Sequence, residues 1–542
     1  MSRIIKYFVF AFVLIFILAC TKDDKLLTGD IKVSEINTKT DYLAPVILEN
    51  DSNKDVQING EPIKFVQGVY ALEDAGFFEM TIGNSDPILF VLLDKERGSP
   101  EWGLKKWIPK EPEIQTVFSG EIEFIHPKNY WPDIPIPFVL KFNNWSVEES
   151  INIACQGNNT TEFLIKNGIG STSIQINNNE VPFLVSTQNY TQTVQEFYAI
   201  DTVLNGTIDT NLIINPNTLV HITNDLNINV TGSLTIMEGC ILMVDEGVNI
   251  TNYGSINFSG IEINPILVTC SETGKYFGGF ISEGGNATIT ADYTFFTNFS
   301  FHSSSEYQYG HAKHQALFKS KNTELTFNNC YFLDTPGQVF YPESCEITIA
   351  NCIVQRAKTS GQINTSTLTI TDSYFSDFPD DSQNYRDQDN DAIYLSGTNA
   401  MISNSMFQYA KDDGIDSGGG EGGTVTIDNC RIEGCFHEGM ALSSSAPAVK
   451  LHTIKNSVIS NCQQGIELGF SSPNHNVIID NCQINNNYVG VRYGDNYEWG
   501  INGTMSLNNS VVLENTRNIW NMVHQIWDPK NENLIINNST ID

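Results

Sequence analysis

Acidic residues recur at equivalent places in the C-terminal half of the chain, in pairs that could bind a divalent cation or cleave a glycosidic bond. The pairs stand eight and nine residues after a repeated Asn or Asp: Asp380 and Asp381, Asp412 and Asp413, then His437 and Glu438. An insertion after the first pair adds Asp387 and Asp389 and is followed at once by Asp391. Carboxylates are the ligands that Ca²⁺ prefers, and glycoside hydrolysis requires a carboxylate pair.

The eight- and nine-residue spacings are counted from a short sequence motif that occurs nine times: apolar, any, apolar, any, Asn, Cys or Ser, any, apolar. Its Asn position, filled once by Asp, is taken by Asn329, Asn351, Asp372, Asn404, Asn429, Asn456, Asn481, Asn509 and Asn538. Alternating apolar residues predict a strand with one buried face. A repeat of about 20–30 residues predicts a solenoid of stacked coils.

The alternation changes parity at the Asn, which predicts a corner there. Asn tolerates left-handed dihedrals, and stacked coils lie about 4.8 Å apart, so the amides can form a ladder. The Cys or Ser that follows is expected to be a small buried residue. Cys330 and Cys352 fall on adjacent coils, which leaves a disulfide possible but not required.

Stacking of the coils should gather the acids at one edge of three neighbouring coils. Like charges about 5 Å apart repel by about 3 kcal/mol at an effective dielectric near 20, so the column needs a cation or bound protons. Three interpretations stay open: a Ca²⁺ site, a catalytic carboxylate pair, or a solvated acidic edge that opposes aggregation. The expected Ca²⁺ ligands are Asp380, Asp381, Asp387, Asp389, Asp391, Asp413 and Glu438.

The repeat resembles the right-handed parallel β-helix of pectate lyases and polygalacturonases, which share an Asn ladder and inward aliphatic stacks. The likeness covers roughly residues 200–542. It implies a C-terminal parallel β-helix. Before it, from Ile47 to about Tyr190, strand and turn patterns without the repeated Asn predict one or two small β-sandwich modules, so the chain is expected to be all-β. Fold alone does not fix the activity.

Polygalacturonases carry Asn-Thr-Asp, then Asp-Asp, then Gly-His-Gly, then Arg-Ile-Lys, and this chain has similar segments. They are Asp389-Asn390-Asp391, Asp412-Asp413, His437-Glu438-Gly439 and Gly490-Val491-Arg492-Tyr493. The resemblance implies that Asp391, Asp412 and Asp413 are catalytic carboxylates. It also implies that His437 orients the acid and that Arg492 clamps a substrate carboxylate.

The chain departs from this pattern in several places: Asn390 is one place too close to Asp391, Glu438 replaces a Gly, Gly494 replaces the Lys, and Arg492 lies one coil too far along. Lyases of the same fold instead use a Lys or Arg as the base, for which Lys411 and Arg386 are the candidates. The enzyme class therefore stays open between a polysaccharide lyase and a glycoside hydrolase. Tyr488, Tyr493, Tyr497 and Trp499 are candidate exposed sugar platforms.

The N-terminus has the pattern of a signal peptide, with Arg3 and Lys6 before an apolar run that ends at Ala19. Residues 17–20, Ile-Leu-Ala-Cys, resemble the lipobox of bacterial lipoproteins, which implies cleavage before Cys20 and lipid on its sulfur. Residues 21–24 look like the export tag of Gram-negative surface lipoproteins. The implied location is the cell surface, as an outer-membrane lipoprotein held to the membrane by its lipid alone.

Composition limits the partners. The net charge of −33 disfavours nucleic acid, because phosphate binding needs clustered Lys and Arg. The predicted function is binding, with or without degradation, of an extracellular polysaccharide by a monomer, and the alternative is a non-catalytic adhesin or scaffold with structural Ca²⁺. The expected divisions are a signal peptide at 1–20, a tether at 21–46, β modules at 47–110 and 111–195, and the β-helix at 196–542.

Overall fold

The computed structural model describes residues 199–379, 389–418, 422–442, 451–468, 476–493, 503–521 and 534–541, together with short segments between residues 25 and 196. The predicted signal peptide and Cys20 lie outside the described residues. Apart from one short 3-10 turn, Ser305–Tyr307, every regular element described is a strand, so the predicted all-β class is confirmed. No helix among the described residues is long and apolar enough to cross a membrane.

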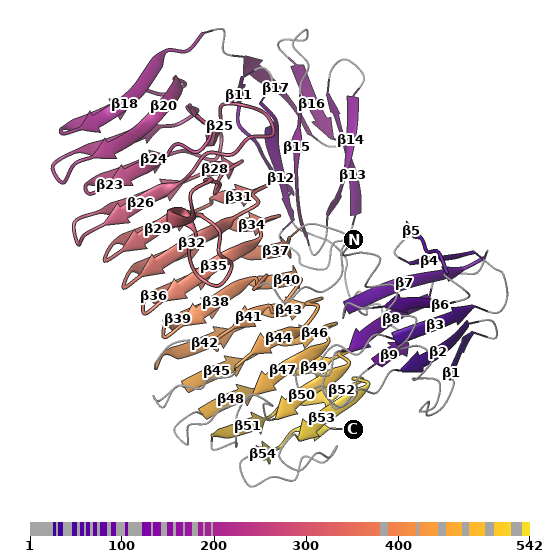
Figure 1. The fold of residues 1–542 in the computed structure, drawn as a ribbon. Coiled ribbons are helices and arrows are strands. Elements are labelled where there is room, and N and C mark those ends of the chain that lie inside the picture. Colours follow the sequence, from indigo (N-terminus) through magenta and orange to yellow (C-terminus); the bar gives the residue numbers. More distant parts are fainter. Residues whose placement is uncertain are drawn as a thin grey trace, which may run out of the picture.

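The C-terminal part is a parallel β-helix with three strands in each coil (Figure 1). One coil, for example, consists of β33 (Glu346–Ala350), β34 (Ile353–Gln355) and β35 (Thr359–Asn364). First strands stack into a 13-stranded sheet from β19 (Asn211–Ile214) to β54 (Leu534–Asn537). The other strands form a continuous 25-stranded sheet from β18 (Thr202–Ile208) to β55 (Thr540–Ile541).

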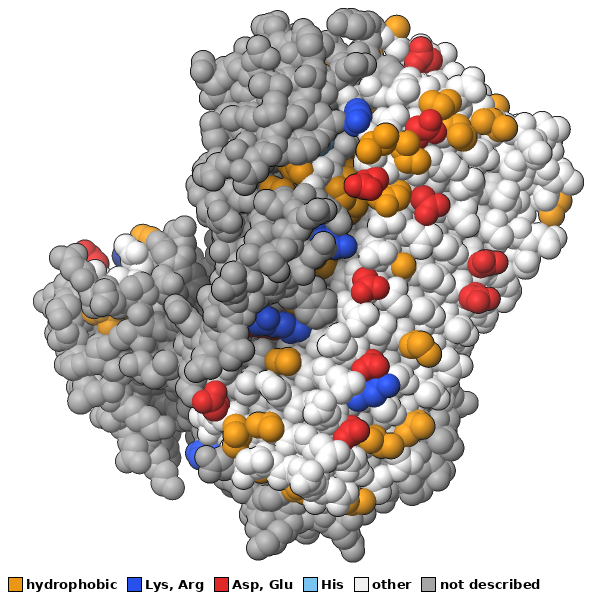
Figure 2. Space-filling model, turned by 180° about the vertical axis from the view of Figure 1, so that it is seen from behind, with side chains coloured by type: hydrophobic (Ala, Val, Ile, Leu, Met, Phe, Trp, Pro, Cys, Tyr) orange, Lys and Arg blue, Asp and Glu red, His pale blue; other side chains and the backbone are white. Residues whose placement is uncertain are grey.

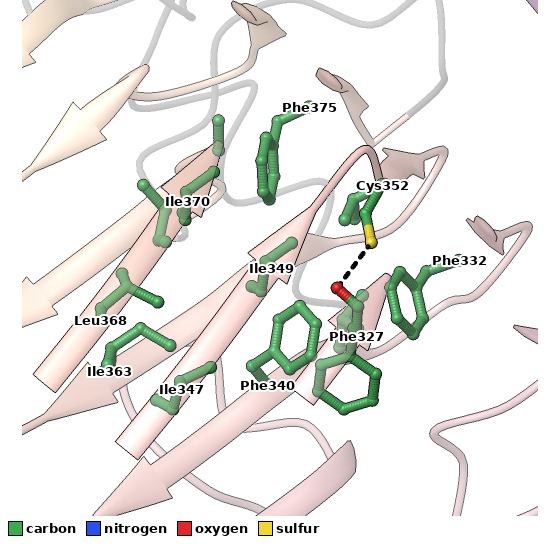
Figure 3. Close-up of a cluster of buried hydrophobic side chains, with 14 of the residues drawn as sticks. Phe327, Phe332, Phe340, Ile347, Ile349, Cys352, Ile363, Leu368, Ile370 and Phe375 are labelled. Atoms are coloured by element: carbon green, nitrogen blue, oxygen red, sulfur yellow. Dashed lines mark hydrogen bonds between the residues drawn. The ribbon is translucent and has the colours of Figure 1, made fainter. Parts of the chain in front are cut away.

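Side chains of the same kind stack on one another inside the coils (Figure 3). Ile347 and Ile349 point inward before the corner, and Cys352 and Val354 point inward after it, each at most 1% exposed, as the alternation predicts. In the neighbouring coils Phe296 lies over Phe332 with parallel rings 5.3 Å apart. Burial of such side chains stabilises the fold by roughly 1.5–3 kcal/mol each, so the stacks supply the driving force for coiling.

The predicted Asn corner is confirmed. All nine ladder residues have φ between 49° and 54°, the left-handed region that Asn and Asp tolerate better than other side chains. Their amides lie on the outside of the coils and pair in alternate steps: Asn429 with Asn404, Asn481 with Asn456, and Asn538 with Asn509, each at 2.8 Å. In between, Asn456 and Asn509 donate to an Asp of the preceding coil.

The Cys or Ser after the corner has a role that packing alone does not explain. Its backbone N–H points inward and donates to the side chain of the equivalent residue in the next coil; Cys352 N, for example, donates to Ser373 Oγ at 3.0 Å. That hydroxyl in turn donates to Thr371 O at 2.7 Å. The same pattern joins Ser373 to Ser405 and Cys430 to Ser457. This buried hydroxyl and thiol ladder satisfies the inward N–H that each corner creates.

The cysteines of this ladder are reduced. Nine described cysteines, including Cys330 and Cys352, are buried and free. Cys330 N donates to Cys352 Sγ at 3.4 Å, so the disulfide that sequence left possible is not formed.

Before residue 199 the described strands form four sheets with mostly antiparallel pairing, where β modules were predicted. The later strands, among them β12 (Ile136–Phe142) and β15 (Ile169–Ile174), lie against the outside of the β-helix. Val139 and Ile169 belong to one apolar cluster with Leu267 and Phe295 of the coils. Asn129 Nδ2 also donates to Gly239 O at 2.8 Å, so this module is held by both apolar and polar contacts.

Replacing Ser373 by Ala should leave the buried Cys352 N–H without an acceptor and destabilise the protein by about 1–3 kcal/mol. Ser373→Cys is the matched control, because Cys352 already makes the same two contacts in its own coil. Thermal and urea unfolding of both variants measures the difference. An Ala variant as stable as the Cys variant would show that the ladder only fills space.

Candidate functional site

The site lies on five consecutive third strands of the coils. They are β38 (Ile393–Ser396), β41 (Ile415–Asp416), β44 (Glu438–Ala441), β47 (Gln464–Leu468) and β50 (Val489–Tyr493). Strand pairing is parallel and in register, with Ile415 opposite Met440 and Ile466 opposite Val491. Residues at one register position therefore stack along the helix axis.

Six carboxylates gather at the start and on the outside of these strands: Asp391, Asp412, Asp413, Asp416, Glu438 and Glu467. We refer to them as the acid cluster. All except Asp416, which is partly exposed, are at most 4% exposed. His437 and Arg492 are buried among them. Buried carboxylates of like charge are costly unless they are neutralised, so this grouping points to a function or to a bound cation.

His437 joins three of the carboxylates. Its Nδ1 lies 3.4 Å from Asp412 Oδ1 and 3.2 Å from Asp413 Oδ1, and it also contacts Glu438 Oε2. The backbone fixes the acids in turn: Asp413 N donates to Asp391 Oδ1 at 3.3 Å, and Glu438 N donates to Asp413 Oδ1 at 2.9 Å. The acids predicted from the repeat are therefore in mutual contact.

Two groups within the cluster have the geometry of a metal site. One ligand atom from each of Asp412, Asp413 and His437 lies within 4.8 Å of the others, and the same holds for Asp391, Asp413 and Asp416. Gln464 adds an amide, whose Nε2 donates to Glu438 Oε1 at 2.9 Å. Carboxylate and amide oxygens suit Ca²⁺, and an imidazole suits a transition metal.

Arg492 lies at the opposite side of the cluster from Asp391. Its guanidinium is 3.0 Å from Glu467 Oε1 and 3.6 Å from Glu438 Oε1, and the residue is 2% exposed. In this structure the cation forms internal ion pairs, and the clamp role expected from the polygalacturonase likeness stays a prediction.

Burial and mutual repulsion alter the ionisation of the cluster. Removal from water raises the pKa of Asp391 well above its ordinary value, and the neighbouring Asp412 adds to this. Removal from water and the charge of Asp413 raise the pKa of Asp416 in the same way. Burial also raises the pKa of Glu438, although His437 opposes the shift. Without a cation, these acids therefore keep their protons to higher pH than free carboxyl groups do.

The structure brings together the predicted residues Asp391, Asp412, Asp413, His437, Glu438 and Arg492. Asp389 stands apart: its Oδ1 lies 3.5 Å from His311 Nδ1 and its side chain is 42% exposed. Asp380, Asp381 and Asp387 lie outside the described residues, as does Arg386. Lys411 Nζ lies 4.2 Å from the centre of the Phe436 ring.

Sequence reasoning misplaced one register position. Counting eight residues from Asn429 and from Asn456 sets His437 level with Gln464. The structure instead pairs Glu438 with Gln464, because the coil that starts at Asn456 reaches its third strand one residue sooner. Sequence reasoning also missed Asp416 and Glu467, which lie twelve and eleven residues after their ladder Asn. Extending the count to those positions would have found both.

The expected aromatic platforms are partly wrong. Tyr488 and Tyr493 are buried, at 2% and 0% exposed, and Tyr493 belongs to the apolar cluster inside the coils. Tyr497 and Trp499 lie outside the described residues.

Residues 363–516 match the family model of the right-handed β-helix region, which fits the predicted fold. A comparison with curated proteins gives no match. Among solved structures, the chain is similar to the crystal structure of a mutant of the periplasmic alginate epimerase AlgG, at 11% identity and a TM-score of 0.28. That alignment covers 61% of this chain and 78% of the other. A score this low carries nothing about activity over to this chain.

The raised pKa values predict that the metal-free protein loses stability as pH rises. Asp391, Asp416 and Glu438 keep their protons in the folded state above the pH, about 4, at which they ionise when unfolded. Folding therefore binds protons, and the unfolding free energy falls as pH increases from that point. Thermal melts in EDTA should give a higher melting temperature at pH 5 than at pH 8.

The Asp416→Asn variant serves as control, because its amide mimics the protonated acid and should flatten the pH dependence. A melting temperature that rises with pH in both proteins would contradict the assignment.

Proposed function

We propose that this chain is an extracytoplasmic, lipid-anchored β-helix protein that binds an extracellular polysaccharide and holds Ca²⁺ in the acid cluster. The burial of five carboxylates, with a partly exposed sixth, beside one guanidinium is the observation that carries the proposal. The anchor is the predicted lipid on Cys20, and the polysaccharide is assigned to the outer surface beside the cluster.

Charge balance favours a cation over protons alone. Arg492 and a protonated His437 cannot neutralise six carboxylates, and each added proton leaves an acid that needs a hydrogen-bond acceptor. Ca²⁺ takes six to eight oxygen ligands at 2.3–2.6 Å in flexible geometry, which the two overlapping ligand groups can supply. A bound Ca²⁺ would also let the anionic surface meet an anionic glycan.

A row of outward side chains leads along the coils to the cluster, and we assign the glycan to it. In successive coils the row holds Lys319, Tyr341, Gln362, Tyr394 and Asp416. One residue per coil gives a spacing of about 4.8 Å. Tyr309 and His311 lie over this row, with ring centres 5.3 Å from that of Tyr341 and 4.6 Å from that of Tyr394, and they add aromatic surface to it. Aromatic rings beside amides and charges are the usual composition of a saccharide surface.

Catalysis is the second candidate. It is favoured by the contact of His437 with both Asp412 and Asp413, since glycoside hydrolysis needs one protonated and one ionised carboxyl group. Near-complete burial of those groups ranks it behind cation binding. A non-catalytic adhesin or scaffold uses the same cation site and makes no product.

Removing divalent cations should destabilise the protein. EDTA is expected to lower the melting temperature by several degrees near neutral pH, and excess Ca²⁺ should restore it, because a ligand that binds only the folded state stabilises by mass action. Asp413→Asn should abolish the response. Asp428→Asn is the matched control, since Asp428 is an acid of the 13-stranded sheet that pairs with Lys455. A response to EDTA that is unchanged in Asp413→Asn contradicts the site.

Glycan binding should depend on the outward row. Tyr341→Ala is expected to weaken binding on a glycan array at least tenfold, because it removes the ring on which Tyr309 stacks and so the aromatic surface of the row. Tyr253→Ala is the control, because Tyr253 is exposed elsewhere on the coils. Reducing ends and absorbance of unsaturated uronates, followed with and without Ca²⁺, separate a hydrolase, a lyase and a protein that only binds. Equal binding by wild type and Tyr341→Ala would show that the glycan does not bind along this row.

A further inference from the structure

Asp413 belongs to both ligand groups of the acid cluster. With Asp412 and His437 it forms a group of nitrogen and oxygen donors, and with Asp391 and Asp416 it forms a group of oxygen donors alone. A carboxylate has two oxygens and can bridge two cations, as in sites whose metal ions lie about 3.5–4 Å apart. The geometry thus offers two adjacent positions with a common ligand.

The two positions differ in chemistry. The first contains an imidazole, which suits Zn²⁺ and other transition metals, and the second contains only carboxylates, which suit Ca²⁺ or Mg²⁺. Mn²⁺ accepts both donor sets. The backbone fixes the bridging residue between them, since Asp413 Oδ1 accepts the Glu438 N–H at 2.9 Å while Asp413 N donates to Asp391 at 3.3 Å.

An independent observation also points to a missing ligand beside the acid cluster, next to Glu438. Gln464 is 2% exposed, and its Nε2 donates to Glu438 Oε1. The second carboxylate oxygen of that residue, Glu438 Oε2, contacts His437. The other end of the same amide, Gln464 Oε1, is also buried and has no hydrogen-bond partner. A buried amide oxygen without a donor is costly, and a cation or a water on a cation would satisfy it.

We infer that the acid cluster holds two divalent cations bridged by Asp413, one at Asp412 and His437 and the other at Asp391 and Asp416. The inference rests on the cation site of the proposed function and extends it from one ion to two. With Arg492 counted in both cases, one divalent cation leaves three of the six negative charges uncompensated, whereas two cations leave one.

Titration of the metal-free mature chain with Mn²⁺ tests this. Wild type should bind two equivalents, measured by calorimetry and by metal analysis after gel filtration. Its electron paramagnetic resonance spectrum should show two exchange-coupled ions. His437→Gln and Asp416→Asn should each retain one uncoupled ion, and Asp413→Asn should lose both. Zn²⁺ binding should fall at least tenfold in His437→Gln and change little in Asp416→Asn, with the opposite result for Ca²⁺.

The outcomes separate the inference from the proposed function. One equivalent of Mn²⁺ in wild type with no coupled spectrum overturns the pair of ions and leaves a single cation site standing. No bound Mn²⁺, Zn²⁺ or Ca²⁺ in wild type overturns both. Because wild-type stoichiometry and coupling are decisive alone, a variant that fails to fold does not weaken the test; melts of each variant identify that case.

Discussion

The register between neighbouring coils governs the rest of this molecule. Parallel pairing in a nearly constant register places each residue over its equivalent in the coil before, as Ile347 over Leu325 and Ile415 over Ile393. Like side chains therefore meet, which is favourable for Ile, Val and Phe in the interior and costly for carboxylates. The corners keep the register, because a left-handed Asn turns the chain and the buried Ser or Cys satisfies the N–H that the turn directs inward. Both features recur in coil after coil.

The same register between coils explains the acid cluster, although the stacking of carboxylates is unfavourable. Asp391, Asp413 and Glu438 occupy successive coils, and their spacing is imposed by strands that apolar stacking already stabilises. Repulsion of about 3 kcal/mol per pair is small beside the burial of a whole coil, so the fold can hold acids together that would separate in a less constrained chain. Such enforced proximity is what a cation site or a catalytic pair requires.

Sequence analysis predicted the features that depend on the repeat alone. The solenoid, the corner at Asn351 and the inward Cys352 all follow from period-two alternation and its change of parity. Features that depend on the number of residues between the corner and the third strand were less predictable. That segment is one residue shorter after Asn456 than after Asn429, so Gln464 pairs with Glu438 and not with His437. Tyr493 was misread as exposed because its face depends on the same count. The docking of the second module through Val139 involves residues too distant in sequence for any periodicity to relate.

Asp416 connects the two functions proposed for this face of the helix. It belongs to the oxygen-donor group of the cluster, and it is also the last partly exposed member of the outward row. A cation that orders Asp416 would therefore act on the neighbour of Tyr394 in the row to which the glycan is assigned. By linkage, any gain in glycan affinity from the cation equals the gain in cation affinity from the glycan. The stacking that brings the acids together thus also places Asp416 where binding of a cation and binding of a surface ligand would be coupled.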